Sequence, residues 1–262
     1  MKMKRYISLL LVLLPLLPSC HKEAPAEEPQ KDTAFVSIHS FATKAQIGTN
    51  AIPSWSEGDA VSILGDASDT PAEFTLRSGA GYSVASFEGI APDGERFIVC
   101  SPSDAKCDGE TFRGKLSTQV THSMPVQPLG ALPLWGETRD LSSVSLECLC
   151  GILSINLKGN VALKSVTLDA GKAVSGEFIY NIKAKLFAMI GGSNVIIMDA
   201  SRTGLIESKE IPFHFILPPG EYEDITLTIV DADDETYYIT VDDTIQIDPG
   251  VFSSLSYDLK DY

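Results

Sequence analysis

Short stretches in which apolar and polar residues alternate follow one another along most of the chain beyond residue 32. In AFVSIHSF, residues 34–41, the odd-numbered residues fall on one face and the even-numbered residues on the other. Similar runs recur at 59–64, 73–77, 82–87, 96–100, 144–150, 152–157, 163–168, 176–182, 194–198, 211–217, 224–230, 236–241 and 244–247. A period of two, with Gly, Pro, Asp and Ser between the runs, is typical of β-strands joined by turns. No segment of a dozen residues keeps a helical period, so the pattern predicts an all-β fold of sandwiches or barrels.

The run VSLECLCGILSINLKG, residues 144–159, is too long for an ordinary strand. Even positions before Gly151 hold Val144, Leu146, Cys148 and Cys150, whereas odd positions after it hold Leu153, Ile155 and Leu157. A glycine bulge at Gly151 would re-aim the strand in this way. A second series of strands begins after Lys158-Gly159-Asn160, so we expect two domains, at 33–159 and 160–262, which suits the usual domain size.

The first nineteen residues have the pattern of an export signal. A basic start with Lys2, Lys4 and Arg5 precedes an apolar run at 6–17 and a short Pro-Ser stretch. A membrane span needs about 20 apolar residues, and this run is shorter, so it predicts a processing segment. The sequence LPSC, ending at Cys20, resembles a bacterial lipobox, which implies that the cysteine carries lipid and becomes the new N-terminus. The alternative is a secretory signal with a chance cysteine.

Residues 20–32 contain no aliphatic side chain larger than alanine and are rich in Glu. Such a stretch cannot bury a core, so we interpret it as a flexible acidic tether. The full chain has 20 basic and 35 acidic residues, and loss of the signal leaves 17 basic ones, a net charge of −18. An acidic surface of this size repels nucleic acid, which excludes nucleic-acid partners.

Four cysteines remain after Cys20, and an exported chain can keep disulfides. Cys148 and Cys150 are two residues apart on one strand face, a poor geometry for bonding to each other, so each is a small buried side chain or pairs elsewhere. Cys100 and Cys107 enclose a short polar loop and are the better candidates for a disulfide.

No local motif for metal binding or catalysis is present. The four histidines are isolated, with no zinc-type spacing, and there is no G-x-S-x-G elbow, so we expect no metal, no cofactor and no enzyme activity. The loop from Asp231 has acids at EF-hand positions but Thr236 where glycine is needed, which favours a solvated hairpin turn. Trp55 and Trp135 stand beside turns and could stack on sugars, although core positions are more usual.

The stretch FATKAQIGTNAIPSWSEGDAVSIL, residues 41–64, resembles the start of fimbrillin-like lipoproteins, the subunits of type V pili. It contains the motif W-x-x-G-D-x-[IV] at Trp55, Gly58, Asp59 and Val61. Residues 150–170, FILPPGEYEDITLTIVDADDETYYIT (215–240) and the ending IQIDPGVFSSLSYDL also fit the family in the same order. The resemblance implies two tandem transthyretin-like β-sandwiches and an outer-membrane, cell-surface location.

In that family, pilus subunits polymerise by donor-strand exchange after a protease removes the tether and the first strand. The resemblance implies that residues 34–41 are the removable strand and that the cut follows Lys44. Removal of an interior strand exposes unpaired backbone and apolar surface, which a new strand can satisfy. The alternative is a first strand that is never removed.

Two features depart from the family pattern. Lys44 stands where family members cut by an arginine-specific protease have Arg, and DLKDY leaves no long tail as a donor. Both leave room for a tethered anchor or a tip subunit, with other pilus subunits as partners and an unknown surface ligand. The alternative function is a stand-alone surface lipoprotein that binds a glycan or a host protein through loops.

Overall fold

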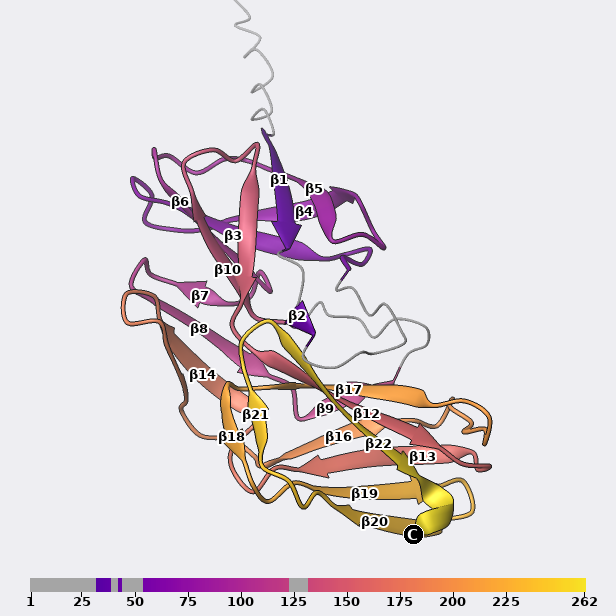
Figure 1. The fold of residues 1–262 in the computed structure, drawn as a ribbon. Helices are drawn as coiled ribbons and strands as arrows, with labels where there is room; N and C mark the ends of the chain where they lie inside the picture. The colour runs from indigo at the N-terminus through magenta and orange to yellow at the C-terminus, as the bar shows by residue number, and fades with distance from the viewer. Residues whose placement is uncertain (1–31, 39–41, 44–53, 123–131) are drawn as a thin grey trace, which may run out of the picture. The chain divides into compact units, whose positions relative to one another are not determined.

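The computed structural model describes the backbone of residues 32–38, 42–43, 54–122 and 132–262, and the side chains of residues 54–122 and 132–262. The described chain consists of β-strands joined by turns, with one short 3₁₀ helix at Leu259–Asp261 and no α-helix (Figure 1). The predicted all-β fold is confirmed. No helix in the described ranges has the length and apolarity that a membrane crossing requires.

The N-terminal strands form a ring of seven that closes on itself (Figure 1). Its core contains large apolar side chains, among them Phe74, Phe87 and Leu146, each fully buried. Around the ring the order is β1 (Asp32–Ile38), β11 (Val144–Cys148), β10 (Leu134–Thr138), β6 (Phe97–Ser101), β3 (Ala60–Gly65), β4 (Ala72–Ser78) and β5 (Val84–Gly89).

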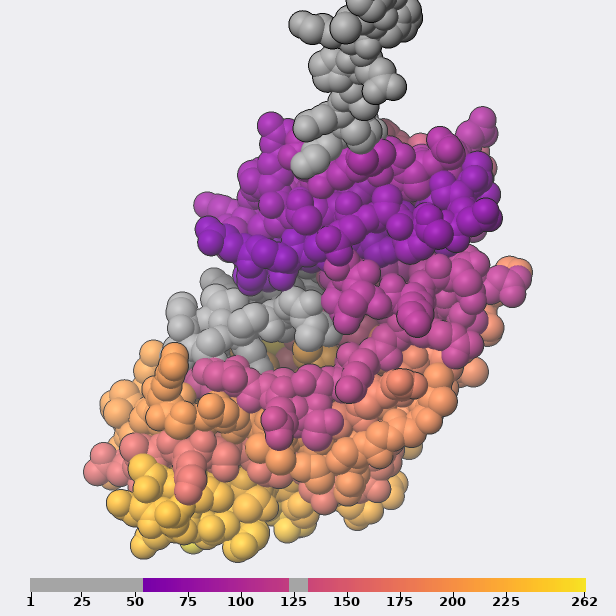
Figure 2. Space-filling model, turned by 180° about the vertical axis from the view of Figure 1, so that it is seen from behind, coloured from indigo at the N-terminus to yellow at the C-terminus, as the bar shows by residue number. Residues whose placement is uncertain are grey.

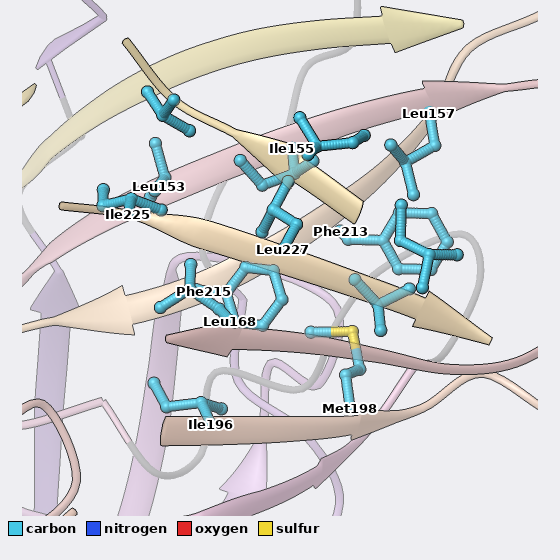
Figure 3. Packing of buried hydrophobic residues seen from close by; sticks show 14 of the residues in the cluster. Leu153, Ile155, Leu157, Leu168, Ile196, Met198, Phe213, Phe215, Ile225 and Leu227 are labelled. Atoms are coloured by element: carbon cyan, nitrogen blue, oxygen red, sulfur yellow. The ribbon is translucent and has the colours of Figure 1, made fainter. Parts of the chain in front are cut away.

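Two further sheets enclose a second core, and most of their strands come from the C-terminal part of the chain. One sheet has the order β17 (Ile211–Leu217), β12 (Gly151–Lys158), β22 (Val251–Asp258) and β2 (Ala42–Thr43). The other has the order β20 (Thr236–Thr240), β19 (Thr226–Asp231), β13 (Leu163–Asp169), β16 (Val195–Asp199) and β9 (Gln119–Thr121). Leu153, Ile155 and Phe213 of the first sheet meet Leu168, Met198 and Leu227 of the second (Figure 3). A separate pair, β18 (Gly220–Tyr222) and β21 (Ile245–Ile247), completes this part.

A further four-stranded sheet joins strands from both sides of residue 159. Its order is β15 (Leu186–Met189), β14 (Gly176–Asn181), β8 (Thr111–Leu116) and β7 (Lys106–Cys107). The magenta chain of β8 accordingly adjoins the orange chain of β14 (Figure 2). Residues 31–262 form one compact unit, and β9 also pairs with β16 across residue 159. The division into domains at 33–159 and 160–262 therefore stays a prediction.

The phase change at Gly151 marks a change of sheet. The expected bulge is wrong, because β11 ends at Cys148 in the ring and β12 begins at Gly151 in a different sheet. A Cβ atom on Gly151 would lie 2.6 Å from the carbonyl oxygen of Asp248, closer than atoms can approach. Glycine is needed there because the backbone of another segment passes at contact distance.

The predicted hairpin near the C-terminus is confirmed, with β19 antiparallel to β20. Asp231 is buried in its turn, and its carboxylate accepts hydrogen bonds from the backbone N–H groups of Asp233 and Glu235, at 3.0 and 2.9 Å. This carboxylate therefore caps the turn, as the interpretation as a hairpin turn requires.

Candidate functional site

The first strand occupies an interior position in the ring. β1 pairs antiparallel with β5, from Asp32 opposite Gly89 to Ser37 opposite Val84. Its other edge pairs in parallel with β11, where Val36 lies opposite Val144. Because β1 is hydrogen-bonded on both sides, its removal would leave two facing edges with unpaired N–H and C=O groups.

The strands on either side of β1 present an apolar surface. Ala85 and Phe87 of β5 and Val144 and Leu146 of β11 are at most 4% exposed. Without β1, these side chains would lie next to the gap in the ring. A segment that filled the gap would regain both backbone hydrogen bonds and apolar burial, the two contributions that drive strand addition.

Beneath this surface lies the tryptophan of the W-x-x-G-D-x-[IV] motif. Trp55 is 3% exposed, and its ring meets that of Phe87 edge to face at 4.9 Å between centroids. Gly58 has a φ of +88°, a conformation that favours glycine, and the side chain of Asp59 accepts a hydrogen bond from the Ser56 N–H at 2.7 Å. The motif thus builds the turn that leads into β3 and holds Trp55 against the ring core.

We expect Asp59→Ala to lower the free energy of unfolding by about 1 kcal/mol, because the half-buried Ser56 N–H loses its acceptor. Chemical denaturation measures this effect. Asp59→Asn keeps an acceptor oxygen and serves as the matched control. If both variants are as stable as the parent, the turn does not depend on this hydrogen bond.

Both tryptophans are core residues. Trp135, on β10, is 8% exposed and packs near Tyr180, with ring centroids 6.2 Å apart. A sugar-stacking tryptophan presents a ring face to solvent, and neither indole does so. The structure therefore gives no support to a glycan site built on Trp55 or Trp135.

Cys20 and Lys44, the predicted lipid attachment point and cleavage point, lie outside the described residues and stay predictions. The two residues of β2, directly before Lys44, pair in parallel with β22, with Ala42 opposite Val251 and Thr43 opposite Phe252. The chain before the predicted cut thus contributes β1 to the ring and β2 to the sheet that contains β22.

Cys100 and Cys107 are brought together as free thiols. A hydrogen bond from the Cys100 thiol lowers the pKa of Cys107 to about 7, while the same hydrogen bond and burial raise that of Cys100. Cys148 and Cys150 are also free, and the Cys148 thiol donates to the Cys150 carbonyl oxygen at 3.1 Å. Burial raises the pKa of Cys148 to about 12, which makes it inert.

The disulfide between Cys100 and Cys107 stays a prediction, and its formation is expected in an oxidising compartment because the lowered pKa supplies the thiolate that attacks. Closing this short loop should raise the free energy of unfolding by about 2–3 kcal/mol. Peptide mapping without reductant detects the bond, and denaturation with and without reductant measures its effect. The matched control is Cys100→Ser with Cys107→Ser, for which reductant should change nothing.

No group of three or more His, Cys, Asp or Glu side chains suited to a metal occurs among the described residues. The sequence did not identify the residues of β5 and β11 as neighbours of the first strand. Nothing in the alternating pattern of these two strands distinguishes them from the others. Pairing between β1 and β11, more than a hundred residues apart, leaves no local signal.

Comparison with solved structures identifies the same fold in two Bacteroides proteins. A protein from Bacteroides ovatus ATCC 8483 that is proposed to act in cell adhesion matches with a TM-score of 0.54 at 14% identity, over 86% of this chain and 91% of that protein. A protein of the same description from Bacteroides uniformis ATCC 8492 matches with a TM-score of 0.52 at 14% identity, over 86% and 93%. No protein-family model and no curated protein matches the chain. At these identities the likeness establishes the fold, which agrees with the resemblance found in the sequence.

Proposed function

We propose that this chain is a lipid-anchored, cell-surface subunit of the fimbrillin type that joins a pilus by donor-strand exchange and contributes to adhesion. The observation that carries the proposal is the position of β1. It pairs on both sides in the ring, next to the buried side chains of β5 and β11. The two matched structures, both proposed to act in cell adhesion, share the fold and add support.

A cut after Lys44 would release two strands together. β1 leaves the ring, and β2 leaves the edge of β22, the eight-residue strand Val251–Asp258 whose other edge pairs with β12. The cut subunit would then offer a gap between β5 and β11 and a free edge on β22. An incoming segment long enough to bind both would replace the contacts of β1 and β2 in full.

The proposal includes lipid on Cys20, an outer-membrane location and other pilus subunits as partners. It assigns the chain no catalytic role, no cofactor and no nucleic-acid partner. If Lys44 is not cut, the same structure serves a subunit that keeps its first strand, as an anchor or a tip. Binding of a glycan through Trp55 or Trp135 is not favoured, since both side chains are buried.

The test is exchange of the first strand. Lys44→Arg allows an arginine-specific protease to cut the folded chain, and a labelled peptide of residues 32–43 is then added in excess. We expect one peptide to bind per cut chain and none to bind the uncut chain. A control peptide with Val36→Pro lacks the N–H at that position and should bind far more weakly. Equal binding of both peptides, or binding of neither, would count against strand exchange.

A further inference from the structure

β15, Leu186–Met189, forms an unpaired edge of the four-stranded sheet β15-β14-β8-β7. It pairs with β14 on one side, and no described strand pairs with its other side. The Ile190 N–H donates to the Glu177 carbonyl at 2.9 Å, so the backbone of even-numbered residues faces β14. In an antiparallel ladder alternate residues face opposite ways, and the N–H and C=O groups of Phe187 and Met189 therefore point away from the sheet.

The edge is apolar and exposed. Leu186 is 64% exposed and Ile190 53% exposed, and Ala188 lies between them on the same face. On the other face, Phe187 stacks on Phe178 of β14 at 4.7 Å between ring centroids. The five residues from Leu186 to Ile190 contain no charge and no proline, the devices that normally protect an edge.

The other edges of the described sheets carry such protection. β2, β7, β9, β18 and β21 have only two or three residues. β17 contains Pro212, and β20 lies between the acidic stretches 233–235 and 242–243, which would repel a second copy.

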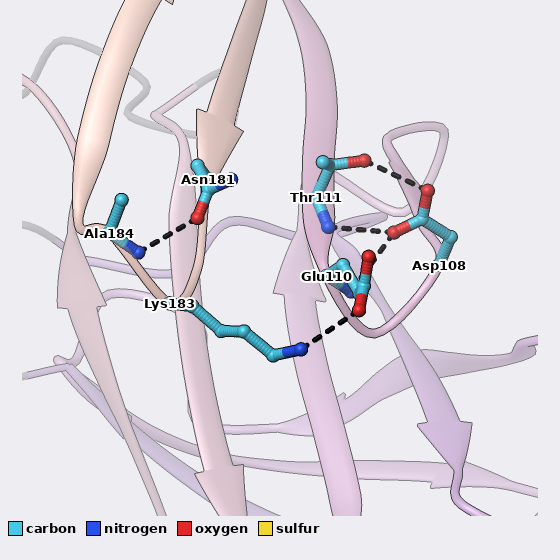
Figure 4. A network of polar contacts seen from close by, with 6 residues as sticks. All are labelled: Asp108, Glu110, Thr111, Asn181, Lys183 and Ala184. Atoms are coloured by element: carbon cyan, nitrogen blue, oxygen red, sulfur yellow. Dashed lines mark hydrogen bonds and ion pairs between the residues drawn. The ribbon is translucent and has the colours of Figure 1, made fainter.

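The turn before β15 is fixed by polar contacts (Figure 4). The Asn181 side chain accepts a hydrogen bond from the Ala184 N–H at 2.8 Å, and Lys183 forms an ion pair with Glu110 at 2.8 Å. The Ile182 N–H also donates to the Glu110 carbonyl at 3.0 Å. An edge that is already ordered loses little conformational entropy when it pairs with a partner.

We propose that this edge binds the β15 edge of a second copy of the chain, antiparallel, about a two-fold axis at Ala188. In this register Phe187 lies opposite the partner's Met189, and both present free backbone groups, so each pair exchanges two hydrogen bonds. Leu186 lies opposite the partner's Ile190, and the small Ala188 lies opposite its own copy. Every apolar residue of the edge therefore meets an apolar residue, as an isologous contact requires.

The charges around the edge agree with this register. Lys185 would stand opposite the partner's Gly191, so no like charges face each other across the axis. The net charge of each copy still repels the other over longer distances, and salt screens that repulsion. The contact is independent of the proposed function, because neither β1 nor Lys44 takes part.

The experiment compares charge variants at the axis in the full mature chain, whose association is measured by analytical ultracentrifugation. The parent should be dimeric at high micromolar concentration, more so at higher salt. Ala188→Lys and Ala188→Glu should each be monomeric, because two like charges meet at the axis, and an equimolar mixture of the two should be dimeric again. Tyr238→Lys, at a 71% exposed position on the β20 edge, is the matched control and should dimerise like the parent.

A cross-link gives a second, independent readout. Residues opposite each other without shared hydrogen bonds have Cα atoms about 4.5 Å apart, which suits a disulfide. Ala188→Cys should therefore form a disulfide-linked dimer on a non-reducing gel, and Tyr238→Cys should not. A parent chain that stays monomeric at every concentration overturns the proposal. Dimers of Ala188→Lys alone that match the parent, or absence of the Ala188→Cys cross-link, overturn it as well.

Discussion

Phe87→Ala should lower the free energy of unfolding by about 3–5 kcal/mol, the cost of emptying a buried phenylalanine site. Phe87 is fully buried on β5 beside β1, and its ring and that of Trp55 meet edge to face. Chemical denaturation followed by tryptophan fluorescence measures the loss. Tyr82→Ala, at a 71% exposed position in the turn before β5, should change stability by less than about 0.5 kcal/mol. Similar values for both variants would show that Phe87 is not part of a packed core.

Phe87→Ala also bears on strand exchange. The cavity lies in the surface that an incoming strand covers, so the cut variant should bind the residue 32–43 peptide more weakly than the cut parent. The cut Tyr82→Ala variant, changed at an exposed position, is the control for this measurement as well. Unchanged peptide binding in the cut Phe87→Ala variant would show that Phe87 stabilises the ring but takes no part in capture of a strand.

Lowering the pH from 7 to 4 should remove about 3 kcal/mol of stability through His214 alone. Burial, followed by the nearby His122, lowers the pKa of His214 to about 4, and its ring packs edge to face on Phe252. The folded chain resists protonation of His214, whereas the unfolded chain accepts the proton near the ordinary pKa of histidine. The stabilisation is therefore fully present above the ordinary pKa. It falls as the pH drops toward 4.

Burial also lowers the pKa of His122, whose ring lies within hydrogen-bond distance of the Thr203 hydroxyl oxygen and the Pro212 carbonyl oxygen. His214→Gln isolates the effect of His214, since this variant cannot gain the proton. Urea denaturation at several pH values should show a shallower loss between pH 6.5 and 4 for the variant. Equal slopes for parent and variant would contradict the assigned burial of His214.

The sequence predicts the strands well because alternation is a local property. The runs at 163–168, 211–217 and 236–241 all become strands, and the acidic link after Asp231 becomes the expected turn. Glycine is required at position 151 because the backbone of Asp248, almost a hundred residues away, passes close to it. In the sequence, the change of sheet appears only as a change in the phase of the apolar residues.

The candidate site was less predictable for the same reason. The first strand, described at Asp32–Ile38, overlaps the alternating run that begins at residue 34, but its two partners, β5 and β11, are set by pairing that no local pattern encodes. The motif at Trp55, Gly58 and Asp59 is evident in the sequence, and only the structure shows that it builds a turn and a core contact. The free edge at β15 follows from its place at the end of a sheet, which the run LFAMI alone does not reveal.

Assembly by donor-strand exchange is tested most directly in surface material from cells that make the protein. The sample is separated in detergent without boiling, blotted with an antibody to the chain, and the N-terminus of the separated bands is sequenced. We expect a ladder at multiples of the subunit that collapses on boiling, with the new N-terminus at Ala45, after the cut at Lys44. A single band that begins at an acylated Cys20 and never forms a ladder would contradict polymerisation by this chain.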